Sequence, residues 1–320
     1  MSGLAKIAVV GSINMDVVNR VVRHPQPGET IHGLSTTYHP GGKGANQAVA
    51  AALAGGDIAL FGAVGEDGFG VELKRTLTEN GVDASSVAVK PGTSGIAFIT
   101  VDDTADNSII LSAGANGQLG AADVDRMLPG LLAAHSVLLQ NEIPWPVTRE
   151  VMEQAHGNGV RVIFNPAPAF LLPEDAYRWI DLLVLNESEA ELLTGIAVAD
   201  GAAAELAADR LLERGAAAVV LTLGERGSLY KAQGMAIGVA TSSYRVRAVD
   251  TTAAGDTFIG ALASATAKGM PIAEGLAFAS AAAAIAVTRA GAQESIPTLE
   301  EIEAFMSNDK VTEGMRNIIP

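Results

Sequence analysis

Residues 136–168, SVLLQNEIPWPVTREVMEQAHGNGVRVIFNPAP, contain the pattern that decides the class of fold. SVLLQNE and RVIFNPAP are short apolar runs typical of buried strands, and TREVMEQAHGNG between them reads as a helix that stops at a glycine. The alternation recurs in the strand-like runs KIAVVGS, DIALFGAVG, DLLVLN and AAVVLTLG and in the helical runs GVELKRTLTENG and AAELAADRLLERG. It predicts an α/β fold, with a mainly parallel sheet covered by helices on both faces.

Two segments interrupt this alternation. Residues from about 15 to 40 and from about 94 to 113 are rich in Thr, Val and Ile and read as successive strands with no helix between them. We expect them to form a small β-sheet, a lid, that projects from the core near Gly41 and Gly42. The expected division is therefore a core of residues 1–14, 41–93 and 114–306, a lid of residues 15–40 and 94–113, and an unassigned tail of residues 307–320.

Composition excludes several classes of protein. With 320 residues, of which 48% are hydrophobic, the chain can bury a large core, and one large domain with a small appendage is expected. A net charge of −15 argues against binding nucleic acid or an anionic membrane through a broad surface. Without cysteine there is no disulfide and no thiol catalysis. No signal-peptide pattern and no long uninterrupted apolar run occur, so we expect a soluble, cytoplasmic protein.

Residues 249–262, VDTTAAGDTFIGAL, predict an anion site that carries a base. An extended segment, YRVRAVDTT, leads into Ala253, Ala254 and Gly255, and the chain then becomes helical. Bare backbone N–H groups at a helix start favour negative charge. Asp256 would repel a phosphate there, so we interpret it as the group that takes a proton from an attacking hydroxyl. The competing interpretation is an ordinary Asp that caps a helix.

A second glycine-rich segment supports the first. Residues 41–48, GGKGANQA, precede the helical run AVAAALAGG, and Lys43 and Asn46 provide donors at the mouth of that helix. Asn14 and Asp16 follow the first strand and point to the same side at period two, where an amide and a carboxylate could each hold a hydroxyl. Each piece taken alone also fits a turn or a helix cap.

Other nucleotide and metal motifs are missing from the sequence. It has no G-x-x-x-x-G-K-[ST] and no G-x-G-x-x-G after the first strand, which argues against a P-loop enzyme and a dinucleotide dehydrogenase. The five histidines have no zinc-like spacing.

The two glycine-rich segments are similar to the signatures of one family. GGKGANQA resembles the first signature of the ribokinase, or PfkB, family of carbohydrate kinases, and DTTAAGDTF resembles the second. The resemblance extends from about residue 7 to about residue 305 and includes GSINMD, HPQPGET, NEIP, NPAPA, NESEAE, TLGERG and AAAAIAVTRAGAQESIP. The wider family usually has Gly where Ala253 stands, but the Ala-Ala-Gly-Asp form occurs among its ribokinase members.

The resemblance implies a function and a sugar site. It implies transfer of the γ-phosphoryl group of ATP to a sugar hydroxyl, O5 of ribose, with Asp256 as general base and the N–H groups of residues 253–255 as anion hole. The positions implied to bind the sugar are Asn14, Met15, Asp16, Gly42, Lys43, Gly44, Ala45, Asn46, Glu142 and Asp256.

The resemblance also implies nucleotide and metal sites. The expected ATP residues are Asn186, Thr222, Leu223, Gly224, Glu225, Arg226, Gly227, Gly255, Asp256 and Ser280. Asn186 and Glu189 are expected to hold Mg²⁺ through water, although a helix cap explains this pair equally well. A monovalent cation, K⁺, is expected at Asp250, Thr252, Ala286, Arg289, Gly291 and Ser295, mostly through backbone carbonyls.

Alternatives remain open at this stage. A kinase of the same family that acts on deoxyribose, a nucleoside or a ketohexose would share the phosphoryl-transfer residues, although GSINMD, GGKGANQA and NEIP together favour ribose. A non-enzymatic sugar- or nucleotide-sensing protein on the same fold would be expected to lack the base. We also expect a homodimer through the outer lid face, which would carry some of Val17, Val21, Ile31, Ile96, Phe98 and Ile109.

Overall fold

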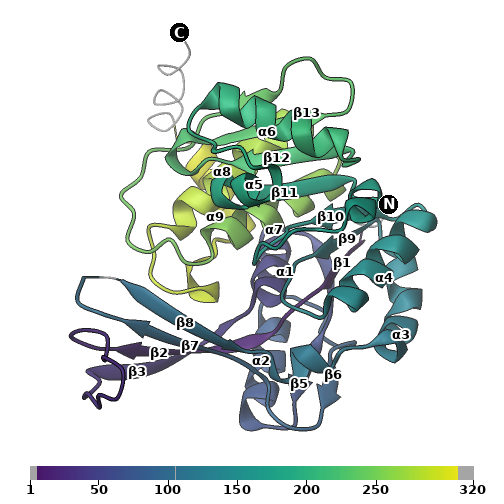
Figure 1. The fold of residues 1–320 in the computed structure, drawn as a ribbon. Coiled ribbons are helices and arrows are strands. Elements are labelled where there is room, and N and C mark those ends of the chain that lie inside the picture. Colours follow the sequence, from purple (N-terminus) through teal and green to yellow (C-terminus); the bar gives the residue numbers. More distant parts are fainter. Residues whose placement is uncertain (1–5, 105, 309–320) are drawn as a thin grey trace.

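The computed structural model of the chain describes residues 6–104 and 106–308 (Figure 1). Most of the unassigned tail, from residue 309 on, lies outside this range. Within the described residues no helix has both the length and the apolar character needed to cross a membrane.

The core is built on an eight-stranded sheet in the order β14-β13-β12-β11-β10-β9-β1-β4. All neighbours from β12 to β4 pair in parallel, and β13 and β14 add an antiparallel edge. The predicted α/β class with a mainly parallel sheet is confirmed. The strands are β1 Lys6–Val10, β4 Asp57–Phe61, β9 Ser136–Leu139, β10 Arg161–Phe164, β11 Leu182–Asn186, β12 Ala218–Thr222, β13 Ser228–Ala232 and β14 Val239–Thr241.

Helices cover both faces of this sheet, because successive side chains of each strand point alternately into two hydrophobic cores. Ala8 and Val10 of β1 belong to the core under α3, α4 and α6, whereas Ile7 and Val9 belong to the core under α1, α2, α7, α8 and α9. The helices are α1 Lys43–Leu53, α2 Gly68–Glu79, α3 Ala121–Leu132, α4 Trp145–Gly157, α5 Glu187–Thr194, α6 Gly201–Glu213, α7 Ala254–Ala267, α8 Ile272–Ala286 and α9 Leu299–Met306. Short 3₁₀ turns are η1 Gly114–Gln118, η2 Glu174–Trp179, η3 Gly224–Arg226 and η4 Gln293–Ser295.

A separate four-stranded sheet projects from the core (Figure 1). Its order is β3-β2-β7-β8, with β2 Asn14–Arg20, β3 Ser35–Gly41, β7 Gly95–Val101 and β8 Asn107–Ser112. We call this sheet the lid. A two-stranded sheet of β5 Ala63–Gly65 and β6 Ala88–Lys90 lies apart from it.

One expected extended segment forms no strand. Residues 244–252, YRVRAVDTT, have irregular backbone. The N–H groups of Val249 and Asp250 both donate to the carbonyl of Val287, at 2.7 and 3.2 Å, so this segment is tied to the end of α8 and not to a sheet. This contact brings the loop before α7 next to the loop after α8.

Candidate active site

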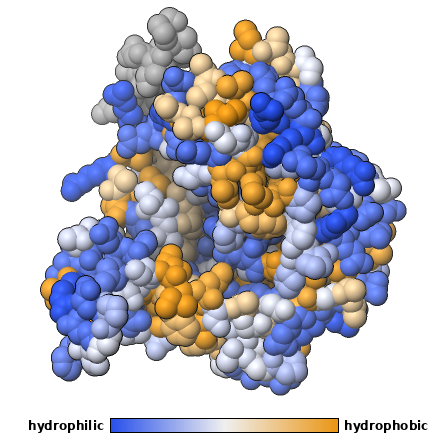
Figure 2. Space-filling model, viewed as in Figure 1, coloured by the Kyte–Doolittle hydropathy of each residue, from blue (hydrophilic) through white to orange (hydrophobic). Residues whose placement is uncertain are grey.

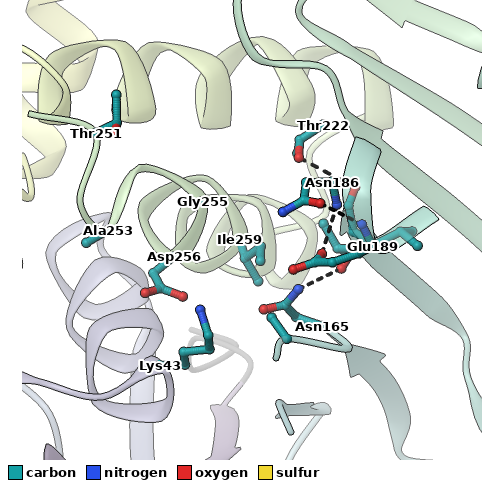
Figure 3. Close-up of a pocket in the computed structure, with 13 residues that line it drawn as sticks. Lys43, Asn165, Asn186, Glu189, Thr222, Thr251, Ala253, Gly255, Asp256 and Ile259 are labelled. Carbon is teal, nitrogen blue, oxygen red and sulfur yellow. Dashed lines mark hydrogen bonds between the residues drawn. The ribbon is translucent and has the colours of Figure 1, made fainter. Parts of the chain in front are cut away.

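A cavity of about 240 Å³ opens at the carboxyl ends of the parallel strands, the usual ligand position in this class of fold (Figure 3). Polar side chains from the ends of β10, β11 and β12 meet the N-termini of α1 and α7 there. Its lining residues are Lys43, Asn165, Ala167, Val184, Leu185, Asn186, Glu189, Thr222, Thr251, Ala253, Gly255, Asp256 and Ile259.

Asp256 lies in the first turn of α7 and is only 8% exposed. Helix α7 begins after Ala253, which has φ 57° and is the one non-glycine residue with positive φ in the part of the chain that the structure describes. Among those residues, the N–H of Ala254 donates to Thr251 O at 3.2 Å, and no partner contacts the N–H groups of Ala253 and Gly255. Two of the three predicted anion-hole donors are therefore available to a ligand.

The Asp256 carboxylate is held by amides from α1. Asn46 Nδ2 donates to Oδ2 at 3.2 Å, and Gln47 Nε2 donates to Oδ1 at 2.9 Å. Lys43, one turn earlier on α1, faces Asp256 across the cavity (Figure 3). The negative charge of Asp256 is the main reason that the pKa of Lys43 is raised, against the opposing effect of burial. A carboxylate and a cation thus share the cavity at the mouth of two helices.

Asn14 is oriented by a residue that sequence reasoning missed. Asn116 donates to Ile13 O and accepts from Ile13 N, which fixes its amide, and its remaining N–H donates to Asn14 Oδ1 at 2.8 Å. Because Asn14 Oδ1 is engaged, the Asn14 amide can offer N–H groups to a ligand.

Asp16 lies on the lid and has a perturbed pKa. Within the described part of the chain, no group donates a hydrogen bond to its carboxylate, which rests against Gly41. Burial, followed by the nearby negative charge of Glu142, raises its pKa to about 7, although His39 opposes this. Asp16 is thus a desolvated acceptor without a partner.

Glu142 is bound to the N-terminus of α1. Its Oε2 accepts from Ser12 Oγ at 2.5 Å and from the N–H of Lys43 at 3.1 Å. The N–H of Gly44 in turn donates to Ser12 Oγ at 3.3 Å. Since all hydrogen bonds of Glu142 with the described residues use one oxygen, Oε1 is left for another donor.

Two predicted sugar residues do not present a side chain to the site. Met15 points to the opposite face of β2 from Asn14 and Asp16 and is buried in the core, as is Ala45 on α1. The resemblance placed Met15 among the sugar-binding positions, and the period-two geometry of the strand explains why its side chain points away from Asn14 and Asp16. Gly42 and Gly44 contribute close backbone packing, since a Cβ on Gly44 would lie 2.6 Å from Gly11 C.

The expected magnesium pair also forms the helix cap that we weighed against it. Asn186 Oδ1 accepts from the N–H of Glu189, and Glu189 Oε2 accepts from the N–H of Asn186, both at 2.9 Å. Both side chains nevertheless line the cavity, and burial raises the pKa of Glu189. The described residues contain no cluster of three or more His, Cys, Asp or Glu that could hold a metal.

The loop expected to surround ATP is only partly at the cavity. Thr222 lines it, but Arg226 is turned away, with its guanidinium bound to Val198 O, Ala199 O and the Glu187 carboxylate. The Arg226 side chain therefore anchors the loop instead of facing a ligand. Leu223 is buried in the core, and Ser280 in α8 does not line this cavity.

The positions expected for K⁺ lie on the loop before α7 and on the segment from the end of α8 to the end of η4, and Asp250 joins these two segments. Its Oδ1 accepts from the N–H and hydroxyl of Thr252, and its Oδ2 accepts from the N–H of Gly291 at 3.0 Å. Ser295 Oγ donates to Ala292 O, and Arg289 pairs with Glu301. Because Glu301 binds the Arg289 guanidinium, which has no acceptor, this position could contribute only its carbonyl to a cation.

Several site residues were not identified from the sequence. Asn165 and Thr251 line the cavity, Gln47 holds Asp256, which also lines it, and Ser12 and Asn116 hold the predicted sugar residues Glu142 and Asn14. Asn165 could have been found, since it follows an apolar strand as Asn186 does. The other four depend on contacts between distant segments.

Comparisons with known proteins agree with this geometry. Residues 4–299 match the model of the pfkB family of carbohydrate kinases. The chain is 41% identical to ribokinase of Schizosaccharomyces pombe over 97% of its length and 100% of that protein, and 39% identical to ribokinase of Haemophilus influenzae over 94% and 98%. The structure of Arabidopsis thaliana ribokinase in complex with ribose and ATP is similar, with a TM-score of 0.89 and 31% identity over 95% of this chain and 99% of that one. The chain belongs to the pfkB family of carbohydrate kinases.

Proposed function

We propose that this chain is a ribokinase, which phosphorylates D-ribose at O5 with ATP. The observation that carries the proposal is Asp256, an almost fully buried carboxylate at the N-terminus of α7, in a cavity shared with Lys43. Ribokinases that match nearly the whole chain, one of them in complex with ribose and ATP, support the choice of substrates.

The reaction needs mainly positioning and charge stabilisation. Asp256 accepts the proton of the attacking hydroxyl. The N–H groups of Ala253 and Gly255 hold charge that develops on the transferring phosphoryl group, with the α7 dipole adding to them. On the other side of the site, Asp16 and Glu142 Oε1 accept hydrogen bonds from ribose hydroxyls, and Asn14 donates one.

The residues at the two expected cation sites have oxygen atoms that could hold Mg²⁺ and K⁺. Mg²⁺ would be held through water by Asn186 and Glu189, where burial of Glu189 favours a compensating positive charge, and it neutralises phosphate charge when bound. K⁺ would be held by Asp250 and by carbonyls of the two loops that Asp250 already joins. Because one of these loops leads into Ala253, its order affects the anion hole.

A substrate panel tests the proposed reaction. ADP release should be fastest with ribose, and slower by at least about tenfold with deoxyribose, fructose and adenosine, because a buried acceptor that loses its donor is costly. Preference for deoxyribose, a nucleoside or a ketohexose would replace ribokinase by that kinase. Absence of ADP release with every sugar and nucleotide tried would favour a sensing protein.

The cation site has its own test. Replacing K⁺ by choline at constant ionic strength should lower kcat, with the ribose KM less affected. Asp250→Asn should lower the rate in K⁺ and make it insensitive to the salt. Equal rates of the unaltered protein in both salts would contradict a working site.

We also propose a homodimer through the outer face of the lid. One row of apolar side chains crosses all four strands there, since Ile110 pairs with Phe98, Phe98 with Val17, and Val17 with Tyr38. Ile110, Phe98 and Tyr38 are exposed, and Figure 2 shows hydrophobic residues gathered where Figure 1 places β8. Two residues named earlier for this face do not belong to it, because Val21 is buried and Ile109 shares the face of Asp16.

A further inference from the structure

Asp256 is one end of a hydrogen-bonded chain of buried amides. Gln140 Nε2 donates to Gln47 Oε1 at 2.7 Å. Gln47 Nε2 donates both to Asp256 Oδ1 at 2.9 Å and to Asn165 Oδ1 at 3.1 Å. Asn165 Nδ2 donates to the backbone carbonyl of Val184 at 3.0 Å. The chain thus connects β11 to the carboxylate at the start of α7.

The direction of every bond in this chain is determined. The carbonyl of Val184 can only accept, so Asn165 must turn its N–H₂ toward it and its oxygen toward Gln47. Gln47 must then present N–H groups to Asn165, and the N–H₂ of Gln140 occupies its oxygen from the other side. The group that Gln47 offers to Asp256 is therefore always a donor.

We propose that Gln47 is a positioning residue for phosphoryl transfer, which fixes the Asp256 carboxylate in one orientation; the inference rests on the proposed function. Gln47 has no exposed surface, so it cannot touch a substrate. Asn46, the other donor to Asp256, is 6% exposed and can still reach the sugar. The two neighbouring amides therefore differ in role.

The physical effect of Gln47 is on the orientation of the Asp256 carboxylate. A donor fixed at Oδ1 limits rotation of the carboxylate, which keeps an acceptor oxygen toward the attacking group. Loss of the donor should thus reduce the chemical step and leave binding nearly unchanged.

Gln47→Met tests this, since methionine has a similar length and no donor. We expect kcat to fall about 10- to 100-fold, from the loss of a hydrogen bond to a charged group, with the KM values for ribose and ATP within about twofold. Gln140→Met, which removes the group that orients Gln47, should show the same changes to a smaller extent.

Ser264→Ala is the matched control. Ser264 Oγ donates to Ala54 O between the same two helices, α7 and α1, and both groups are buried away from the cavity. This variant should lose thermal stability with an unchanged kcat. If Gln47→Met folds and keeps its kcat, or if Gln140→Met and Ser264→Ala lower kcat equally, the positioning role is wrong.

Asp256→Asn separates this inference from the proposed function. A large loss of kcat in Asp256→Asn together with full activity in Gln47→Met would reject the positioning role and leave the base in place. Normal activity of Asp256→Asn would reject the base itself.

Discussion

Two carboxylates of the candidate active site have opposite environments, one on the side of the core, which we call the core wall, and one on the side of the lid, which we call the lid wall. In the core wall, Asp256 receives two amide hydrogen bonds and lies at a helix N-terminus. In the lid wall, Asp16 receives no hydrogen bond from any described residue, and its pKa is raised to about 7. The core group is stabilised before any substrate arrives, whereas the lid group lacks the donors that would compensate its burial.

Under the proposed function, this difference separates the catalytic role of Asp256 from the specificity role of Asp16. A base that is oriented in advance needs no substrate binding energy to orient it, so this energy can stabilise the transition state. An acceptor without a partner favours a ligand that brings hydroxyl donors and penalises one that lacks them. The same chemical group thus serves two purposes because of the neighbours that the fold supplies.

The largest expected effect concerns the core wall. Asp256→Asn keeps the size of the side chain and removes the base, so kcat should fall about 10²–10⁴-fold with sugar and ATP affinity nearly intact. Steady-state kinetics check this. Asp123→Asn is the control, because it removes another buried carboxylate, bound to Lys90 far from the cavity, and should cost stability only.

A substitution in the lid wall should weaken the use of ribose. Asp16→Asn should lower kcat/KM for ribose by more than about tenfold. In the unaltered protein, kcat/KM should rise as Asp16 ionises around pH 7, and this rise should be absent in the variant. A variant that retains the same pH profile would show that another group titrates.

The same substitution should stabilise the ligand-free protein. The pKa of Asp16 in the folded state, about 7, lies above its usual value of 3.8, so the folded protein binds this proton more tightly than the unfolded chain does. The resulting stability is fully present below about pH 4 and is lost as pH rises through about 7. The melting temperature of Asp16→Asn should therefore exceed that of the unaltered protein by a few degrees at about pH 8 and by little at about pH 4. Equal differences at both pH values would contradict the raised pKa.

The outer lid face offers a smaller effect. Phe98→Asp places a charge in the exposed apolar row and should shift a dimer toward monomer at micromolar concentration, with a modest rise in the ribose KM. Ser108→Asp adds the same charge to the same face outside that row and should leave the dimer intact. Light scattering measures both. A monomer before any substitution would reject the proposed assembly.

The smallest effect concerns the turn before α7. Ala253 has φ 57°, a conformation that a residue with a Cβ adopts at a cost and glycine adopts freely. Ala253→Gly should raise the free energy of unfolding by up to about 1 kcal/mol, with kcat within about twofold. Ala254→Gly, at the first helical position, should lower it by up to about 1 kcal/mol. Chemical denaturation distinguishes the two, and a loss in both would mean that the turn is unstrained.

The main sheet and the residues that follow its strands could be predicted from the sequence, because both depend on local patterns of period two or 3.6. The sequence also singled out Asp256, because its segment resembles a family signature, although a carboxylate at a helix start can equally be an ordinary cap. Gln47 could not be identified, because an amide on α1 gains its meaning only where α7 and β10 bring Asp256 and Asn165 to it. Arg226 was expected to contact ATP because of its place in TLGERG. The sequence could not show that its side chain binds residues 187, 198 and 199, because these are distant from it in sequence.

Gly42 is the only residue between β3 of the lid and α1, the helix that carries Lys43, Asn46 and Gln47. Its φ is 89°, and a Cβ there would lie 2.8 Å from Asn14 N, so a side chain is excluded by both conformation and space. A substitution at Gly42 would change the angle of the lid and the direction of α1 together. Under the proposed function, a change of sugar binding at Gly42 would also move the amides of α1 that donate to Asp256, so the lid strands are the better place for substitutions that alter the range of substrates.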